Sequence, residues 1–359
     1  MKGYLVLQNG KVYEGKRFGS TRDSVGELVF STAMVGYCET LTDPSYYGQI
    51  IMQTFPLVGN YGVCGEDFES DRIYAFGYIV RQLCDTPSNF RSQGGLEDML
   101  IKYDIPALQG IDTRAVTRQV REAGVMNAAI VSDISDMPRI LDMLSRYSVK
   151  DAVSNVSSGK KSLVTDSRAP TVVLWDFGAK GNIVRHLAAR GLNVICAPYN
   201  YGAKRIMSLN PDGIMLSNGP GDPMENTGVI KELKSLLGVG VPIFGICLGH
   251  QLLALAHGAA THKLKYGHRG INQPVKFTES GRVYVTSQNH GYAVMSESLP
   301  KGARLMCVSM NDGTCEGAAY DDGSYSVQFH PEAGAGPHDT QFLFDGFADK
   351  VTSYHLSKH

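Results

Sequence analysis

Residues 241–256 read VPIFGICLGHQLLALA, and this stretch sets the framework for the second half of the chain. Residues 241–246 form an apolar run of strand length, while 248–257 carry the small and aliphatic residues typical of a buried helix. Between them stands Cys247, two positions from a glycine on either side. The segment therefore predicts a strand that turns sharply into a helix, with the cysteine at the turn.

The G-x-C-x-G pattern is the cysteine form of the G-x-S-x-G nucleophile elbow. Such a turn lifts its central side chain clear of the sheet and places it at a helix N-terminus, where unpaired N–H groups and the helix dipole stabilise a thiolate. The alternative is a small buried cysteine that only packs, as most cysteines do. The flanking strand and helix favour the nucleophile.

Around this elbow, apolar runs alternate with helical patterns from residue 171 to residue 257. Strands are expected at 171–177, 192–198, 213–217 and 241–246, with helices at 181–190, 202–209, 227–237 and 248–257. Almost wholly apolar strands separated by helices predict a doubly wound α/β domain with a mostly parallel sheet. Beyond residue 270, Asp-Gly turns separate β-rich runs, which predict antiparallel strands at one edge of that sheet, and a final helix is expected near 339–351.

The first half of the chain has a mixed pattern. Strand-like runs occur at 4–8, 27–32, 50–55, 73–80 and 126–132, and helical periodicity at 95–103, 112–123 and 136–147. Asp112 and Gly124 are suited to cap the two ends of the second helix. Residues 151–170 are rich in Ser, Lys and Asp. We therefore expect a domain at 1–150, a linker at 151–170 and the α/β domain at 171–359.

A thiolate nucleophile needs a partner that both accepts and returns a proton, and histidine suits that role near neutral pH. His330 follows a β-like run and precedes Pro331 and Glu332. In an extended segment, residues two apart project to the same side, so Glu332 is expected beside the imidazole of His330. His290 is a rival base that has no nearby carboxylate in sequence. A surface His-Pro-Glu turn is the alternative interpretation.

The stretch LSNGPGDP (216–223) follows a buried strand and predicts a loop whose backbone N–H groups, from Gly219 and Gly221, are available to an oxyanion. An ordinary Gly/Pro turn is the alternative. Gln251 lies one helical turn beyond Cys247 and is expected to face the same pocket, as is the segment SQNHGYAV (287–294).

Composition excludes several classes of function. The 34 basic and 35 acidic residues give a net charge of −1, which offers no electrostatic reason to expect nucleic acid as a partner. No apolar stretch is long enough for a membrane span, and the N-terminus lacks a signal-peptide pattern, so a cytoplasmic location is expected. The seven cysteines contain no CxxC pair, and His257, His262 and His268 lack metal-ligand spacing, so no metal site is predicted.

The motifs NGPGDP, GICLGHQ, NHGYAV and QFHPEA, in this order, resemble those of triad (class I) glutamine amidotransferases over about 171–359. LTDPSYYGQI, NFRS and GIDTRAVTRQVREAG resemble the amino-terminal domain of the carbamoyl phosphate synthetase small-subunit family. This resemblance implies a β/β/α swivelling-type fold for the first domain and docking of that domain on a large subunit.

The resemblance also implies residue roles. Cys247 would attack the side-chain amide of L-glutamine, His330 would be the general acid/base and Glu332 its orienting partner. The N–H groups of Gly219 and Leu248 would form the oxyanion hole. The implied glutamine contacts are Ser45, Gly219, Gly221, Leu248, Gln251, Asn289, Gly291 and Tyr292. Ser45 comes from the first domain, and its alternative role is that of a turn residue after Asp43-Pro44.

Family members pass ammonia to the large subunit, which makes carbamoyl phosphate from bicarbonate and ATP for arginine or pyrimidine synthesis. No cofactor is therefore expected in this chain, and ATP and Mg²⁺ are expected on the partner. The sequence departs from the family at Tyr292, where Phe is common, and at Gly334-Ala335, where Ser-Pro is common. An inert docking subunit, or an amidotransferase of another pathway, are the competing hypotheses.

Overall fold

In the computed structural model, which describes residues 1–159, 161–163, 166 and 168–358, strand β11 (Thr171–Asp176) buries apolar side chains on both faces. Val172 and Leu174 belong to one hydrophobic core, and Val173 and Trp175 to another. Successive residues of a strand point to opposite faces, so the sheet that contains β11 is covered on both sides. This confirms the predicted doubly wound α/β arrangement.

The chain divides into two units, Met1–Ala152 and Val153–His359. Among the described residues of the second unit, ten strands form one sheet in the order β10-β12-β11-β13-β14-β19-β18-β17-β15-β16. Strands β12, β11, β13, β14 and β19 are parallel, and the pairs from β19 to β16 are antiparallel, as is β10 on β12. The tail strands thus extend the parallel sheet at one edge, as the sequence predicts.

The strands of the second unit are β10 (Lys161–Leu163), β11, β12 (Asn193–Pro198), β13 (Gly213–Leu216), β14 (Ile243–Ile246), β15 (Thr261–Phe277), β16 (Val283–Val294), β17 (Ala303–Ser309), β18 (Cys315–Tyr320) and β19 (Tyr325–Val327). Its helices are α5 (Ala152–Val156, which begins at the last residue of the first unit), α6 (Gly181–Ala188), α7 (Ala203–Met207), α8 (Thr227–Lys234), α9 (Leu248–Ala256) and α10 (Phe342–Ser357), with short 3-10 turns η3 (Pro223–Glu225) and η4 (Ser296–Ser298).

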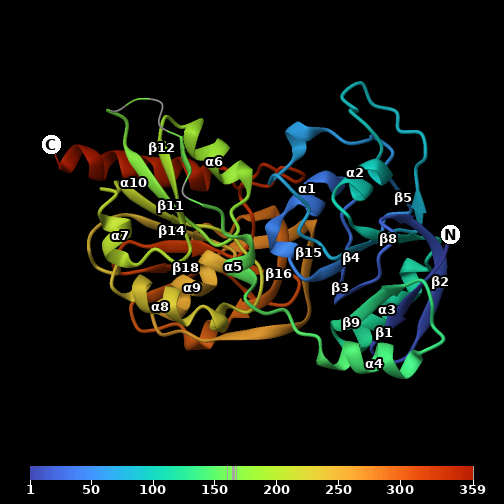
Figure 1. The fold of residues 1–359 in the computed structure, drawn as a ribbon. Helices are drawn as coiled ribbons and strands as arrows, with labels where there is room; N and C mark the ends of the chain where they lie inside the picture. Colours follow the sequence, from blue (N-terminus) through green and yellow to red (C-terminus); the bar gives the residue numbers. More distant parts are fainter. Residues whose placement is uncertain (160, 164–165, 167, 359) are drawn as a thin grey trace. The chain divides into compact units, whose positions relative to one another are not determined.

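Helices cover both faces of this sheet. Figure 1 shows α6 and α10 on one side of the parallel strands and α8 and α9 on the other. The two hydrophobic cores agree with this view, because Ile183 of α6 and Phe347 of α10 pack in one core, whereas Leu233 of α8 and Leu252 of α9 pack in the other. The carboxyl ends of the strands are left for loops and for the elbow at Cys247.

The first unit is β-rich, as expected. Seven strands close into a barrel in the order β1-β2-β8-β6-β4-β3-β9, with β9 pairing back on β1. The barrel strands are β1 (Lys2–Leu7), β2 (Val12–Gly19), β3 (Ser24–Ser31), β4 (Gln49–Gln53), β6 (Gly77–Ile79), β8 (Pro106–Gln109) and β9 (Met126–Val131). The remaining elements are α1 (Tyr37–Thr42), η1 (Pro44–Tyr46), β5 (Leu57–Val58), η2 (Gly65–Asp67), β7 (Gln82–Leu83), α2 (Leu96–Lys102), α3 (Thr113–Ala123) and α4 (Met137–Arg146).

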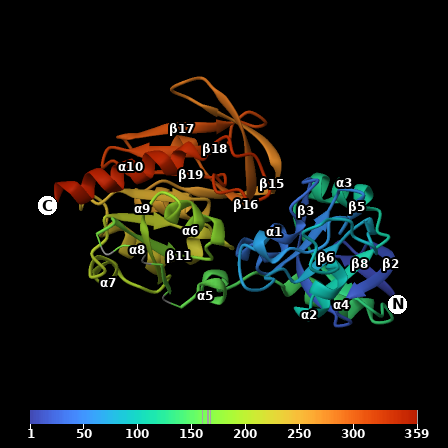
Figure 2. The ribbon, with the colours of Figure 1, turned by 90° about the horizontal axis from the view of Figure 1, so that it is seen from above.

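The caps predicted for α3 are present. The Asp112 side chain accepts a hydrogen bond from the N–H of Ala115 at 3.0 Å, and Gly124 ends the helix with a positive φ of 94°. In Figure 2 the strands and helices of this unit lie together in the blue and green part of the chain.

Part of the segment predicted as a linker is folded. Val153 of α5 belongs to a core of the second unit, and the backbone N–H of Ser158 donates to the Asp176 carboxylate at 2.7 Å. Strand β10 pairs with β12. Residues 160, 164, 165 and 167 lie outside the described part of the chain. Among the described helices, none has both the length and the apolar content needed to cross a membrane.

Candidate active site

Cys247 stands at the sharp turn between β14 and α9, as predicted. Its φ is 53° and its ψ is −105°, a conformation that non-glycine residues seldom adopt. The backbone N–H donates to the Val327 carbonyl at 2.9 Å, which anchors the turn to β19. The sheet therefore holds the cysteine in a strained backbone conformation, as expected of a nucleophile elbow.

The two glycines of the G-x-C-x-G motif are required by close packing. A Cβ atom added to Gly249 would lie 2.4 Å from the Leu216 carbonyl oxygen, and one added to Gly245 would lie 2.7 Å from the Gly249 carbonyl oxygen. Contacts under 3.0 Å to backbone cannot be relieved by side-chain rotation, so the helix could not approach the sheet this closely with any other residue. The glycines set the position of α9 below the cysteine.

The environment of the sulfur fits a nucleophile. Cys247 is 3% exposed and serves as N-cap residue of α9, a nine-residue helix. Its Sγ lies 3.8 Å from the carbonyl oxygen of Asn289 in β16. The sulfur therefore lies at the positive end of the α9 dipole, and the N–H of Gly249 in the first turn donates to the Ser217 carbonyl at 3.0 Å.

His330 and Glu332 form a buried pair. Nδ1 of His330 lies 2.7 Å from Oε1 of Glu332, and both residues are 1% exposed. Burial and the nearby ammonium of Lys180 oppose protonation of His330, but the charges of Glu332 and Cys247 outweigh them and raise its pKa to about 10. An imidazolium held between a carboxylate and a sulfur is consistent with a Cys-His-Glu triad.

Glu332 has a second partner that sequence reasoning missed. Lys180 is a buried residue, and its Nζ atom lies 3.1 Å from Oε1 of Glu332. Burial raises the pKa of Glu332, but Lys180 and His330 lower it more, to about 2. Lys180 precedes α6 at the end of the loop that follows β11, so only the assembled sheet brings it to the triad.

The His330–Glu332 contact does not arise from extended backbone, which the sequence predicted wrongly. The backbone N–H of His330 donates to the Ser287 carbonyl at 2.9 Å, but the N–H of Ala333 donates back to the His330 carbonyl at 3.3 Å. Glu332 therefore lies in a turn and not in an extended strand. The turn, rather than strand alternation, directs the carboxylate to the ring.

Gln251 links α9 to two strands. Its amide nitrogen donates to the Tyr292 carbonyl at 2.9 Å and to Oε1 of Gln328 at 3.0 Å. The hydrogen bond from Gln251 to Tyr292 and the contact between Cys247 and Asn289 fix the segment 289–292 of β16 beside the elbow. Gly291 lies in the same segment. Four of the predicted glutamine contacts are thus neighbours in space.

The predicted oxyanion residues also meet. A Cβ atom added to Gly219 would lie 2.8 Å from Cδ2 of Leu248 and 2.3 Å from the Phe177 carbonyl oxygen. The Asn218 side chain accepts a hydrogen bond from the Lys180 N–H at 3.0 Å, which ties this loop to the one that carries the lysine. Gly221 follows with a φ of 88°. Gly219 and Leu248 are therefore adjacent at the carboxyl end of the sheet.

Ser45 belongs to the first unit. It is the middle residue of η1, it is 7% exposed, and its N–H donates to the Asp43 carboxylate at 2.9 Å. The turn-residue interpretation accounts for that hydrogen bond. The proposed contact of Ser45 with glutamine remains a prediction.

The family models match both halves of the chain. The model described as "Carbamoyl-phosphate synthase small chain, CPSase domain" matches residues 5–130, and "Glutamine amidotransferase class-I" matches residues 173–350. The carbamoyl phosphate synthase small chain of Archaeoglobus fulgidus is 47% identical, over 99% of this chain and 100% of its own length. The chain belongs to the carbamoyl phosphate synthase small-chain family.

Two further small-chain relatives support this assignment. The carbamoyl phosphate synthase small chain of Clostridium perfringens is 49% identical over 97% of this chain and 99% of its own length. The carbamoyl phosphate synthase pyrimidine-specific small chain of Bacillus subtilis is 47% identical over 98% of this chain and 96% of its own length. The resemblance read from the motifs is thereby confirmed. As a small chain with a class I domain, the protein is a glutamine amidotransferase subunit.

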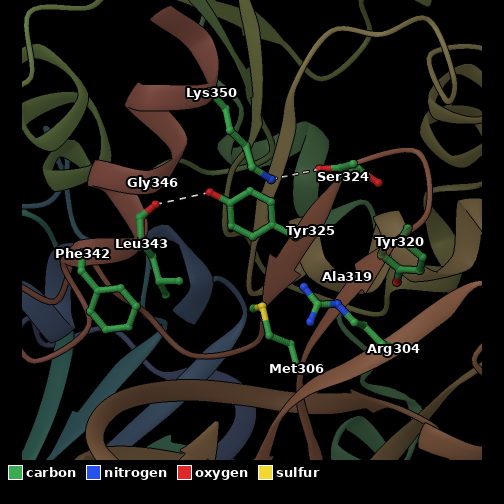
Figure 3. Close-up of a pocket in the computed structure, with 11 residues that line it drawn as sticks. Arg304, Met306, Ala319, Tyr320, Ser324, Tyr325, Phe342, Leu343, Gly346 and Lys350 are labelled. Carbon is green, nitrogen blue, oxygen red and sulfur yellow. Dashed lines mark hydrogen bonds between the residues drawn. The ribbon is translucent and has the colours of Figure 1, made fainter. Parts of the chain in front are cut away.

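A separate pocket of about 320 Å³ in this small chain lies between α10 and strands β17–β19. Figure 3 shows two of its polar side chains bonded to backbone: Lys350 donates to the Gly323 carbonyl at 3.3 Å, and the Tyr325 hydroxyl donates to the Leu343 carbonyl at 3.3 Å. Tyr325 begins β19, whereas His330 follows its other end. The predicted site residues lie elsewhere, so this pocket is distinct from the triad.

Proposed function

We propose that this chain hydrolyses the side-chain amide of L-glutamine and supplies the ammonia to a carbamoyl phosphate synthase large chain. The observation that best supports the proposal is the convergence of two distant segments of the sequence: Cys247 on a strained elbow, and His330 with Glu332 at 2.7 Å from its imidazole. The charge of Cys247 acts on His330 and raises the pKa of the imidazole. The thiol, the imidazole and the carboxylate are the groups that nucleophilic acyl transfer needs.

In the proposed reaction, the Cys247 thiolate attacks the amide carbon of glutamine and forms a tetrahedral adduct. His330 gives its proton to the amide nitrogen, the C–N bond breaks, and ammonia leaves behind a γ-glutamyl thioester. A water molecule then loses a proton to His330 and attacks the thioester carbon, which releases glutamate and the thiolate. Glu332 holds the imidazole through Nδ1 and stabilises its charged form throughout.

Charge on the carbonyl oxygen develops in both steps and needs donors already in place. We assign this role to the backbone N–H groups of Gly219 and Leu248, two residues that are neighbours in space. The substrate itself would be held by Gly221, Gln251, Asn289, Gly291 and Tyr292, with Ser45 contributed by the first unit. Tyr292 keeps the aromatic ring that the family commonly has as Phe at this position.

The partner is the large chain that the family name implies, and the first unit is the proposed docking region. The large chain would bind bicarbonate, ATP and Mg²⁺ and make carbamoyl phosphate, while this chain needs no cofactor for glutamine hydrolysis. The product would enter arginine synthesis, pyrimidine synthesis or both. The Bacillus subtilis relative is named as pyrimidine-specific.

The test uses the chain co-purified with its large-chain partner. Carbamoyl phosphate formation should be supported by glutamine and by ammonium salts in the native complex, and by ammonium salts alone in the Cys247→Ala complex. A diazoketone analogue of glutamine should label the native chain at Cys247. Loss of both activities in the Cys247→Ala complex would indicate a folding or docking defect and not a missing nucleophile.

The competing hypothesis is an inert docking subunit. It predicts a native complex that uses only ammonium salts and takes up no label. The match of residues 5–130 to the small-chain model argues against an amidotransferase of another pathway.

A further inference from the structure

Three strands of the second unit bring together two imidazoles and one carboxylate that the triad does not use. His268 of β15, His290 of β16 and Glu316 of β18 each offer a ligand atom, and these atoms all lie within 4.8 Å of one another. His268 and His290 face each other across the β15–β16 ladder, with ring centroids 4.9 Å apart and planes at 85°. The spacing along the chain gives no hint of this cluster, because each residue comes from a different strand.

In each imidazole, one nitrogen points away from the cluster and has a hydrogen-bond acceptor as its partner; we call it the outer nitrogen, and the other the inner nitrogen. Nδ1 of His290 lies 2.8 Å from the Tyr292 carbonyl oxygen, and Nε2 of His268 lies 2.8 Å from the Asp312 carboxylate. A carbonyl or carboxylate oxygen only accepts, so in the neutral form of each imidazole, the form that binds a metal, these outer nitrogens carry the ring protons. The inner nitrogens, Nε2 of His290 and Nδ1 of His268, then present lone pairs to the cluster.

Glu316 points a third acceptor into the same space. It is fully buried, and among the described residues its oxygens have no hydrogen bond of ordinary length and angle, although His268 and Gln288 lie close enough to oppose the rise in its pKa that burial causes. Its Oε1 lies 3.5 Å from Nδ1 of His268 and 3.8 Å from Nε2 of His290. Three lone-pair groups that face one another away from water are costly unless a cation lies between them.

We propose that His268, His290 and Glu316 bind one divalent transition-metal ion of the zinc class. Two imidazole nitrogens and one carboxylate oxygen are a donor set typical of zinc, whereas magnesium and calcium prefer oxygen alone. The two nitrogen–oxygen separations are close to the roughly 3.4 Å expected between two ligands of a tetrahedral zinc. The Gln288 side-chain oxygen, 3.4 Å from Nε2 of His290, is placed to be a fourth ligand.

The surroundings resemble an outer shell. Ligating histidines usually donate their second N–H to a carboxylate or a backbone carbonyl, and here Asp312 and the Tyr292 carbonyl take those two roles. A bound ion would join β15, β16 and β18 at one point. Because His290 stands between Asn289 and Gly291, the ion would also stiffen the segment assigned to glutamine binding. The proposal does not depend on that assignment.

The test is metal binding to the full chain carrying Cys247→Ser, so that the catalytic thiol cannot take the metal. After dialysis against a chelator, Co²⁺ should bind at one ion per chain with the visible absorption of a tetrahedral complex, and Zn²⁺ should displace it. Asp312→Asn should weaken binding roughly 10- to 100-fold, as loss of an outer partner does. His268→Asn and Glu316→Gln should weaken it further.

His257→Asn is the matched control, because His257 also pairs with a carboxylate, Asp322 at 3.6 Å, but lies outside the cluster. It should leave Co²⁺ binding unchanged. Circular dichroism establishes that each variant is folded, and the exposed Asp312 keeps the test valid if Glu316→Gln does not fold. The proposal is overturned if no Co²⁺ binds, or if Co²⁺ binds equally well to the folded cluster variants and the control.

Discussion

Replacing Lys180 with methionine should destabilise the second unit by an amount that distinguishes a buried charge pair from a surface one. The Lys180 side chain is 9% exposed and that of Glu332 is fully buried, with 3.1 Å between Nζ and Oε1. The variant would leave the carboxylate with one cationic partner instead of two. Removing one member of a buried pair costs about 3–5 kcal/mol, because the remaining charge stays out of water.

The assay is urea unfolding followed by tryptophan fluorescence. The chain contains one tryptophan, Trp175, which is fully buried in β11, so the signal reports on the second unit alone. The double variant Lys180→Met with Glu332→Gln should recover most of the loss, since it leaves no unbalanced carboxylate. Glu279→Gln is the control: Glu279 and Arg304 form an exposed pair at 3.0 Å, which contributes little.

The reasoning is refuted if Lys180→Met lowers the free energy of unfolding by less than about 1 kcal/mol, the range of exposed pairs. It is also refuted if the double variant is less stable than the single variant. Either outcome would mean that Lys180 does not balance Glu332 in the folded chain.

The remaining predictions concern the nucleophile, the elbow and acid stability. Cys247→Ala should abolish glutamine hydrolysis while thermal unfolding shows a folded chain; hydrolysis at the native rate would exclude the thiolate. Gly249→Ala should cost about 1–3 kcal/mol by overpacking against Leu216, seen as a lower melting temperature, whereas Gly228→Ala, with open space around it, should not lower it. Because the folded pKa of Glu332 is lowered to about 2 from 4.5, its stabilisation is present above pH 4.5 and is lost as the pH falls toward 2. Urea unfolding across that range should therefore show a smaller decline for Glu332→Gln than for the native chain; an equal decline would contradict the shift.

The doubly wound half of the fold could be predicted from local pattern. Its strands are apolar on both faces, and its helices begin and end close to the residues expected. The sequence could not predict that β3, β4 and β6 pair in parallel to close the barrel of the first unit, because strand pairing depends on contacts between residues far apart in the chain. Strand β2, eight residues long, and the six-residue helix α1 lack apolar periodicity, so the sequence does not predict them.

In the candidate active site too, local motifs could be predicted, whereas contacts between residues far apart in the chain could not. Motifs predict Cys247, His330 and Glu332. The contact between His330 and Glu332 comes from a turn and not from strand alternation. Lys180 could not be predicted, because lysine is usually exposed and nothing near it in sequence identifies its partner. From sequence, His290 is only a rival base with no carboxylate nearby, whereas in the structure another strand supplies one, Glu316.

The positive φ of Cys247 has a consequence for laboratory evolution of this chain. Strain of this kind costs on the order of 1–3 kcal/mol, and glycine is the residue that tolerates the conformation best. Selection for heat resistance alone would therefore favour glycine at the position of the thiol and yield a sturdier protein that can no longer attack an amide. A screen that selects for thermal stability without also measuring glutamine hydrolysis would therefore tend to lose Cys247.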